Sequence, residues 1–394
     1  MEDVMLYIHI PFCIRKCLYC DFLSAPADRE SQSLYVDALL REMELKKEII
    51  KERRISSIFI GGGTPSALDI PVLNKLLTGI KNTFAPDSEC EYTIECNPGT
   101  LTKEKLIFMK EHGVNRLSIG LQSMNDDELK TLGRIHTADD FKESYLFARE
   151  AGFTNINVDI MSSLPGQDIK TFEKTLTAVT ELSPEHISVY SLIIEEGTDF
   201  YKKYAKDIER RAKGEDTVYL PDEDTEYKIG KYTTEMLESL GYHRYEISNY
   251  AKQGRECRHN TGYWQRRDYL GLGLGAASLI EGTRYKNITG LYDYTNLYSN
   301  RKETPDIKSG YEESEKLSCM DEMEETMFLG LRMVEGVNIS AFEKRFGVSI
   351  QDVYKERIDS LLADELVLID GDRLKLTDRG LDLGNYVYSM FLFD

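Results

Sequence analysis

Three cysteines lie close together near the start of the chain and could hold a metal centre. Cys13, Cys17 and Cys20 have the spacing C-x3-C-x2-C in a single loop. Three thiolates at this spacing can bind three corners of a cubane iron–sulfur cluster, which leaves the fourth iron without a local protein ligand. Catalytic metal sites keep an open position of this kind, whereas structural sites are closed. The pattern therefore predicts a cluster that can bind a further ligand.

A structural zinc site is the alternative interpretation of the same thiols. Zinc would need a fourth ligand, for which His9, Cys90 and Cys96 are candidates, and a second C-x2-C pair is missing from the sequence. The pattern favours the cluster over zinc, and over three thiols that are merely buried.

The elements expected to position this loop alternate along the first half of the chain. β-branched runs predict strands at residues 5–10, 55–60, 91–95, 116–119, 155–160 and 186–190. Amphipathic patterns predict helices at residues 33–51, 71–82, 102–111, 139–151 and 169–182. Since parallel neighbours need a helical crossover, this order predicts an α/β protein with a parallel sheet. Periodicity alone leaves an open partial barrel and a doubly wound sheet as alternatives.

The pattern changes after residue 195. A charged stretch at 201–226 precedes a helix ending at 240, a short strand at 245–248, and a segment rich in Tyr and Gly at 257–298. Helices near 322–332, 340–346 and 351–363, strands at 366–369 and 374–376, and a last helix to 391 then outline a winged helix. We predict three parts: residues 1–195, an extension at 196–309, and a C-terminal winged-helix-like domain at 310–394.

Composition excludes several classes of function. The net charge is −19, and the C-terminal part is also acidic, so we expect no nucleic-acid partner. Seven cysteines, an odd number with three in one loop, do not indicate a disulfide framework and favour a reducing compartment. The longest mostly apolar stretch, residues 269–280, is too short and rich in glycine to span a bilayer. We therefore predict a cytoplasmic protein without a transmembrane segment.

Residues able to bind a ligand follow several of the predicted strands. The second strand ends in Gly61-Gly62-Gly63-Thr64-Pro65, where missing side chains let the backbone approach a ligand. Other strands are followed by Glu95, Gln122 and Asp159, and Arg134 could pair with a carboxylate in bidentate fashion. Each has a structural explanation when taken singly. Because parallel strands end at one edge of a sheet, together they favour a binding site there.

The cysteine spacing, with the aromatic Tyr19 directly before the last cysteine, resembles the signature of radical S-adenosylmethionine (SAM) proteins. The resemblance implies a [4Fe–4S] cluster on Cys13, Cys17 and Cys20, whose unique iron is chelated by SAM. It covers nearly the whole chain in the coproporphyrinogen-oxidase-like branch, and implies a partial (β/α)6 barrel. The SAM-contacting positions of that branch fall on nine residues: Tyr7, Tyr19, Gly62, Gly63, Thr64, Glu95, Gln122, Arg134 and Asp159.

Two kinds of protein in this branch compete. The oxygen-independent coproporphyrinogen III oxidases decarboxylate two propionates, whereas the HemW-like haem chaperones insert haem into target proteins. The oxidases carry another cysteine two residues after the triplet, where this chain has Phe22, and a long extension before it, whereas the first cysteine here is at position 13. Both differences favour the chaperone. A radical SAM enzyme acting on another substrate is the third alternative.

A second motif also resembles the chaperones. The run His259-Asn260-Thr261-Gly262-Tyr263-Trp264 matches their HNxxYW pattern. The resemblance implies haem as cargo, together with a haem-accepting protein and an electron donor as partners. The imidazole of His259 could ligate haem iron while Tyr263 and Trp264 pack on the macrocycle. The alternative is a histidine that caps a turn with aromatic residues in a core, and Cys257 is interpreted as a buried small residue.

The chain departs from the family pattern at two places. Ala277 stands where the family commonly has histidine, after a YxGxGxGA stretch at residues 269–276. Ser162 and Ser163 stand where tyrosine and glycine are usual before Leu164-Pro165. We expect these differences to alter haem handling or the shape of the pocket.

Overall fold

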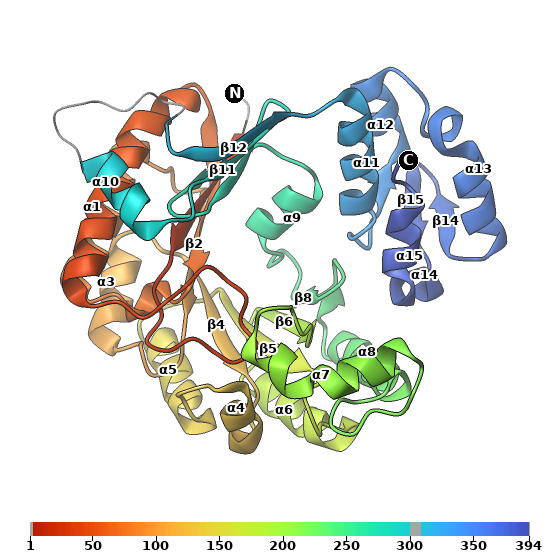
Figure 1. The fold of residues 1–394 in the computed structure, drawn as a ribbon, viewed down its shortest axis with the longest axis horizontal. Helices are drawn as coiled ribbons and strands as arrows, with labels where there is room; N and C mark the ends of the chain where they lie inside the picture. Colours follow the sequence, from red (N-terminus) through yellow and green to blue (C-terminus); the bar gives the residue numbers. More distant parts are fainter. Residues whose placement is uncertain (1–2, 300–308, 394) are drawn as a thin grey trace.

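Six parallel strands in chain order form the centre of the structure. The computed structural model describes residues 3–299 and 309–393. Its central strands are β1 (Asp3–Ile10), β2 (Arg54–Gly62), β3 (Glu91–Cys96), β4 (Arg116–Gln122), β5 (Ile156–Ser162) and β6 (His186–Ser191). The crossovers contain α1 (Arg29–Lys46), α2 (Ile70–Phe84), α3 (Lys103–Glu111), α4 (Asp126–Leu132), α5 (Ala138–Glu150) and α6 (Ile169–Glu181), which cover the outside of the curved sheet (Figure 1). The predicted open barrel is confirmed.

Strands from the second half extend this sheet at both edges. Beside β1 lies the parallel β9 (Tyr269–Leu272), followed by the antiparallel β10 (Ala277–Ile280), β11 (Thr283–Asn287) and β12 (Tyr311–Lys316). Beside β6 lie β8 (Asn249–Ala251) and β7 (His243–Arg244). The predicted strand at 245–248 is wrong, because these residues connect β7 to β8. Strand β9 was not predicted, because glycines in it and in the loop after it interrupt the alternation of apolar and polar residues that indicates a strand.

Hydrogen bonds between N-cap side chains and the first turn determine where several helices begin. Thr102 caps α3 by accepting from Lys105 N, and Asp168 caps α6 by accepting from Thr171 N. The helix predicted at 33–51 begins earlier, because Asp28 accepts from Ser31 N, and α1 ends at Lys46. The remaining helices before the C-terminal domain are α7 (Asp199–Ala212), α8 (Glu223–Ser239), α9 (Arg258–Trp264) and α10 (Leu291–Ser299).

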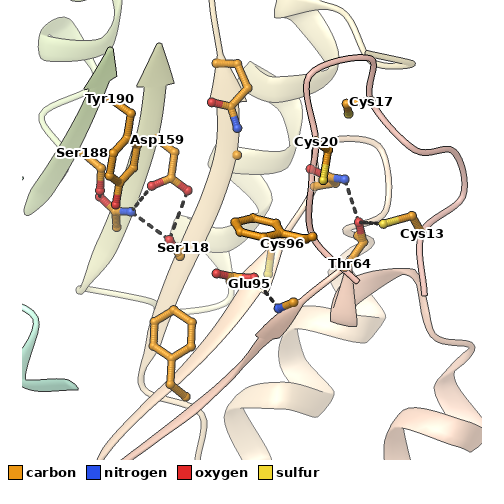
Figure 2. Close-up of a pocket in the computed structure, with 18 of the residues that line it drawn as sticks. Cys13, Cys17, Cys20, Thr64, Glu95, Cys96, Ser118, Asp159, Ser188 and Tyr190 are labelled. Atoms are coloured by element: carbon orange, nitrogen blue, oxygen red, sulfur yellow. Dashed lines mark hydrogen bonds between the residues drawn. The ribbon is translucent and has the colours of Figure 1, made fainter. Parts of the chain in front are cut away.

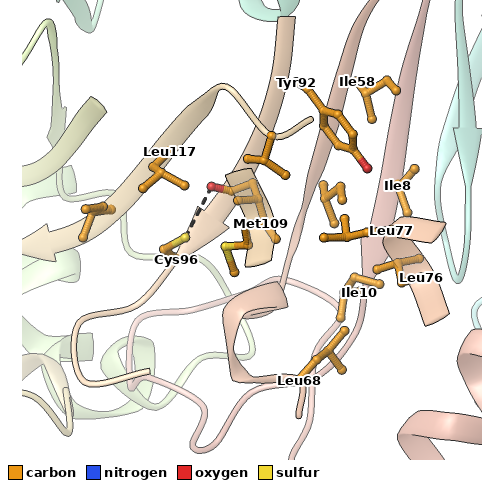
Figure 3. Packing of buried hydrophobic residues seen from close by; sticks show 14 of the residues in the cluster. Ile8, Ile10, Ile58, Leu68, Leu76, Leu77, Tyr92, Cys96, Met109 and Leu117 are labelled. Atoms are coloured by element: carbon orange, nitrogen blue, oxygen red, sulfur yellow. Dashed lines mark hydrogen bonds between the residues drawn. The ribbon is translucent and has the colours of Figure 1, made fainter. Parts of the chain in front are cut away.

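The main hydrophobic core lies between the sheet and the crossover helices. Figure 3 shows Leu76 and Leu77 of α2 beside the strand residues Ile8 and Ile58, all of them buried. Because successive side chains of a strand point to opposite faces, the residues between these apolar ones face the inside of the barrel. The concave face is therefore free to carry polar side chains.

The C-terminal domain has a core of its own, from Met323 to Phe391. It contains α11 (Cys319–Gly330), α12 (Ile339–Phe346), α13 (Ile350–Ala363), α14 (Asp378–Asp382) and α15 (Gly384–Ser389), with a three-stranded sheet of β13 (Val337–Asn338), β15 (Arg373–Leu376) and β14 (Val367–Asp370). The last predicted helix is in fact α14 and α15, separated at Leu383. Arg266, two residues after α9, joins the domain to the barrel through ion pairs with Glu322 and Glu325.

None of the helices among residues 3–299 and 309–393 combines the length and the apolar character needed to cross a membrane.

Candidate functional site

A cavity of about 470 Å³ lies inside the barrel. Alternate residues of the strands line it, for example Arg116, Ser118, Gly120 and Gln122 of β4, because every second side chain of a strand faces the same side. The three cysteines and all nine residues predicted to contact SAM line this single cavity. The structure therefore brings the whole predicted cluster and SAM site together.

The loop with the three cysteines is held at several points. Cys13 N donates to Ala25 O (3.2 Å), and Leu18 N donates to Leu132 O (3.1 Å) at the end of α4. Phe200 N in turn donates to Leu18 O (2.9 Å). Gly133 lies against this loop with φ 77°, and a Cβ there would be 2.8 Å from Leu18 Cγ. A glycine at this position lets the loop cross the mouth of the barrel.

The three sulfur atoms lie at one end of the cavity (Figure 2). Thr64 Oγ1 donates to Cys13 Sγ (3.6 Å), and Arg134 Nη1 donates to Cys17 Sγ (3.5 Å). Within the described part of the chain, no three His, Cys, Asp or Glu side chains converge closely enough to hold a metal ion as they stand. The thiols must therefore turn toward one point to bind a cluster.

The fourth ligands considered for zinc are already engaged elsewhere. The two ring nitrogens of His9 lie 3.0 Å from Tyr7 OH and 2.9 Å from Leu23 O. The Cys96 thiol donates to Ile94 O (3.6 Å; Figure 3), and the buried Cys90 thiol donates to Glu91 O (3.7 Å). Three thiols without a free fourth donor fit a [4Fe–4S] cluster with one open iron better than they fit zinc.

The glycines after β2 fit tightly against the cysteine loop. Gly63 N donates to Ile10 O (2.9 Å), and Thr64 N donates to Phe12 O (2.7 Å). A Cβ on Gly62, whose φ is 109°, would lie 2.4 Å from the His9 ring, and one on Gly63 would lie 2.5 Å from Phe12 O. The protein's own packing thus requires these glycines, besides any approach of a ligand.

Two carboxylates line the cavity, Glu95 on β3 and Asp159 on β5. Glu95 accepts from Gly62 N (3.0 Å), and Asp159 accepts from Asn157 Nδ2 (2.8 Å) and Ser118 Oγ (3.2 Å; Figure 2). Burial, together with the charge of Asp159, raises the pKa of Glu95 to about 7. Burial also raises the pKa of Asp159. Glu95 can therefore change its charge near neutral pH.

Gln122 and Arg134 take positions that the sequence alone does not show. Gln122 has the left-handed φ of 74°, beside an irregularity in the register of β4 with β5, which redirects its side chain. Arg134 Nη2 donates to Gly120 O (2.6 Å) and to Asn97 Oδ1. Since Asn97 Nδ2 donates to Thr64 Oγ1 (2.9 Å), Arg134 connects the cysteine loop to two strand ends. Its pairing with the SAM carboxylate stays a prediction.

The HNxxYW motif forms α9 and is only partly in the cavity wall. His259 and Tyr263 line the cavity, but Trp264 does not, and its ring lies 4.5 Å from the Arg332 guanidinium. The His259 nitrogens lie 2.8 Å from Ser57 Oγ and 3.2 Å from Tyr263 OH. His259 is 1% exposed, and burial lowers its pKa to about 3. Both nitrogens of His259 therefore have partners in this structure, and Trp264 lies outside the cavity wall. Their roles toward haem stay predictions.

The structure shows where the two departures from the family pattern lie, at Ser163 and at Ala277. Ser163 has φ 61°, a left-handed conformation that favours glycine, and it accepts from Ser191 Oγ (3.1 Å). Ala277 is exposed at the start of β10 and does not line the cavity. The missing histidine thus leaves the cavity wall unchanged. Cys257 is fully buried, as expected.

Sequence reasoning missed four of the polar residues that line the cavity: Asn97, Arg116, Asn157 and Tyr190. Polar residues at every second position of an apolar strand could have indicated Arg116 and Asn157. Asn97 and Tyr190 become recognisable only when the strand ends are placed side by side.

Comparisons with known proteins agree with this geometry. The profile of the Radical SAM superfamily matches residues 7–179, and that of the HemN C-terminal domain matches residues 317–383. The chain is 38% identical over 387 residues to "Heme chaperone HemW" of Bacillus subtilis, with 98% of each chain covered. It is 36% identical over 388 residues to the protein of the same name from Lactococcus lactis, covering 98% of this chain and 97% of that one.

Among solved structures, the chain resembles coproporphyrinogen III oxidase (HemN) from Escherichia coli. The TM-score is 0.83 at 23% identity, over 99% of this chain and 90% of that chain, which establishes the shared fold.

The barrel, the cysteine loop and the cavity define a radical SAM protein, a class that implies a [4Fe–4S] cluster and SAM. Within this class, the chain belongs to the HemW family.

The pKa of Glu95 leads to a prediction for SAM binding. With a pKa of about 7, the carboxylate is about one-tenth ionised at pH 6 and about nine-tenths ionised at pH 8. If ionised Glu95 accepts hydrogen bonds from SAM, the affinity should rise about tenfold between these pH values. Isothermal titration of the cluster-loaded protein with SAM measures this change.

The Glu95→Gln variant should bind SAM more weakly and without this rise, whereas Glu89→Gln, at an exposed position, should keep the wild-type profile. An affinity that falls from pH 6 to pH 8, or an unchanged profile in Glu95→Gln, would contradict the assignment.

Proposed function

We propose that this protein binds haem and transfers it to haem-requiring proteins, using a [4Fe–4S] cluster on Cys13, Cys17 and Cys20 and SAM in the barrel cavity. The observation that carries the proposal is the full-length similarity to curated heme chaperones, combined with a cavity that keeps every predicted cluster and SAM residue. The similarity to coproporphyrinogen III oxidase supports the fold and not its decarboxylation reaction.

Several residues at the cluster end of the cavity would hold the cluster and SAM, each in a different way. When bound, the cluster supplies an open iron for SAM and a source of single electrons. Thr64 and Arg134 contact the Cys13 and Cys17 thiols and orient them. Tyr19 lines this end of the cavity and packs against Phe200, with 6.2 Å between the ring centroids. Glu95 and Asp159 line the same cavity and would accept hydrogen bonds from the ammonium or ribose groups of SAM.

The size of the cavity affects where haem can lie. A volume of about 470 Å³ is in the range for one small ligand, so SAM and a whole macrocycle do not fit together. We place the macrocycle at the mouth, where Ile14 and Phe22 of the cysteine loop are 57% and 61% exposed. Ligation by His259 would require Tyr263 OH to leave its Nε2 atom, so we do not place the haem iron there.

The experiment compares haem with a porphyrinogen substrate. Anaerobic, cluster-loaded protein is mixed with SAM and then with either haemin or coproporphyrinogen III. We expect a Soret band that saturates with haemin, transfer of that haem to apomyoglobin as a test acceptor, and no release of carbon dioxide from coproporphyrinogen III. Release of carbon dioxide with loss of propionates would replace the chaperone proposal with the oxidase.

A matched pair of variants tests the position of the macrocycle. Phe22→Asp places a charge on the proposed apolar face and should weaken haemin binding about tenfold or more, since about 1.5–3 kcal/mol is typical for burying such a side chain. Leu34→Asp, at an exposed position of α1, should leave haemin affinity unchanged. Equal affinities in the two variants would place haem elsewhere.

The cellular setting is part of the same proposal. All seven cysteines are free in the structure, including the exposed Cys319, which suits a reducing compartment. We propose a cytoplasmic location, with an electron donor for the cluster and a haem-accepting protein as partners.

A further inference from the structure

Among the residues that the structure describes, Arg116 is a buried charge without a direct partner. It is the first residue of β4, its side chain is 1% exposed, and it lines the cavity. Its Nε has no hydrogen-bond partner within residues 3–299 and 309–393, and the same part of the structure shows no ion pair for its guanidinium. Leaving a buried charge unpaired costs several kcal/mol, so such groups are normally paired or bind a ligand.

The acidic groups near Arg116 direct their oxygens to other donors. Glu91 accepts from Arg258 N (3.0 Å) and His259 N (3.1 Å) at the start of α9. Asp159 accepts from Asn157 and Ser118. Both carboxylates attract Arg116 electrostatically but form no ion pair with it. The guanidinium therefore remains available to a group inside the cavity.

The position of Arg116 separates it from the SAM end. The cysteine loop lies at the C-terminal ends of the strands, whereas Arg116 begins a strand of seven residues. At about 3.3 Å per residue, its Cα is about 20 Å from that of Gln122. Thr93 of β3 is paired with both Arg116 and Phe59, so Phe59 lies at the same level of the wall. The charge of Arg116 also acts on His259 of α9, which lines the cavity. This end of the cavity is here called the floor.

We propose that the floor is a carboxylate-binding subsite in which the Arg116 guanidinium pairs with one carboxylate. The planar fork of arginine matches a carboxylate in bidentate fashion. Glu91 and Asp159 would repel a second negative charge, which disfavours a phosphate dianion. The carboxylate can come from a free small acid or, when SAM is absent and the macrocycle enters the cavity instead of lying at its mouth, from a propionate arm of a tetrapyrrole. This subsite goes beyond the proposed function, because it does not depend on haem being the cargo.

The test uses the full-length, cluster-loaded protein saturated with SAM, and sodium propionate as the probe. Binding is followed by the fluorescence of Trp264, the single tryptophan of the chain, and by the thermal midpoint, against sodium chloride at equal ionic strength. Propionate should raise the midpoint of the wild type. The Arg116→Gln variant should bind propionate at least tenfold more weakly, and Arg116→Lys should be intermediate because it keeps the charge but loses the fork.

Arg15→Gln is the matched control, because Arg15 lines the same cavity from the exposed cysteine loop. It should respond to propionate like the wild type. The proposal is wrong if sodium chloride raises the thermal midpoint of the wild type as much as sodium propionate does. It is also wrong if Arg116→Gln shows the full rise with propionate. If Arg116→Gln does not fold, the Lys variant decides in the same way.

A second comparison distinguishes the two sources of the carboxylate. Haemin and its dimethyl ester are titrated, without SAM, into the wild type and Arg116→Gln. Weaker binding of haemin alone, with the ester unaffected, assigns the subsite to a propionate arm. A loss confined to free propionate assigns it to a small acid. No loss with either probe overturns the proposal, and haemin binding by the wild type reports separately on the proposed function.

Discussion

Replacing Cys17 with alanine is expected to abolish the iron–sulfur absorbance of the reconstituted protein. Cys17 lies in the middle of the loop, and its thiol accepts from Arg134 Nη1 at the cluster end of the cavity. Two remaining thiols cannot hold a cubane that already lacks a fourth protein ligand. Absorbance near 400 nm and iron content per chain, measured without oxygen after reconstitution, check the prediction. Binding of SAM should be lost in the same variant.

Two other cysteines supply matched controls for this experiment. Cys96 lines the same cavity but donates its thiol proton to Ile94 O, and Cys319 is exposed in the C-terminal domain. Cys96→Ala and Cys319→Ala should each keep four irons per chain. Loss of the cluster in Cys96→Ala, or a four-iron spectrum in Cys17→Ala, would show that the ligand set is wrong. Zinc in the anaerobically purified protein would do the same.

Replacing Lys46 with methionine is expected to lower the free energy of unfolding by about 3–5 kcal/mol. Lys46 and Glu42 form a fully buried ion pair on α1, with 2.7 Å between Nζ and Oε1. Lys46 also donates to Asn287 Oδ1 (2.9 Å), and its Nζ lies 3.9 Å from the centre of the Tyr311 ring. Burial lowers the pKa of Lys46, although Glu42 opposes this effect. Without the ammonium, the Glu42 charge would remain buried and uncompensated.

This network joins distant parts of the sheet to α1. Glu42 Oε2 accepts from Gly273 N (2.7 Å) in the glycine-rich loop after β9 and from Tyr294 OH (2.6 Å) on α10. Urea unfolding followed by circular dichroism measures the loss. The double variant Lys46→Met with Glu42→Gln should recover part of it, because the stranded charge is removed.

Lys47 provides the control for the loss of a lysine charge. Its ion pair with Glu44 has an N–O distance of 2.6 Å but lies at the surface. Lys47→Met should leave the urea midpoint unchanged, since exposed ion pairs contribute little. Equal losses in the Lys46 and Lys47 variants would mean that the buried network does not stabilise the fold.

The barrel could be predicted from the sequence because its signals are local. Strands β1 to β6 contain β-branched runs, and the helices between them carry one apolar stripe each. Pairing of β9 to β12 with this sheet could not be predicted in the same way. It depends on contacts between residues far apart in the chain, such as Tyr7 of β1 with Gly271 of β9.

The candidate site was also predicted to different degrees along its length. The cysteine loop is marked by the spacing of its thiols, and the strand ends by polar residues that indicate a site only when taken together. The floor of the cavity has no such pattern, because Arg116 of β4 and Phe59 of β2 come to the same level of the wall only in the folded barrel. The position of Trp264 outside the cavity wall could not be predicted for the same reason: its ring packs on Arg332, which is far from it in the sequence.

By itself, the sequence determined the chemistry of the cluster loop and the order of strands and helices, because thiol spacing and hydrophobic period are properties of neighbouring residues. Only the tertiary structure decided which polar groups share the cavity and which donors are already used. Both nitrogens of His259 are engaged, whereas the Arg116 guanidinium forms no ion pair within the described residues. The physical reason is that a side chain becomes available to a ligand through its burial and its partners, which long-range packing sets.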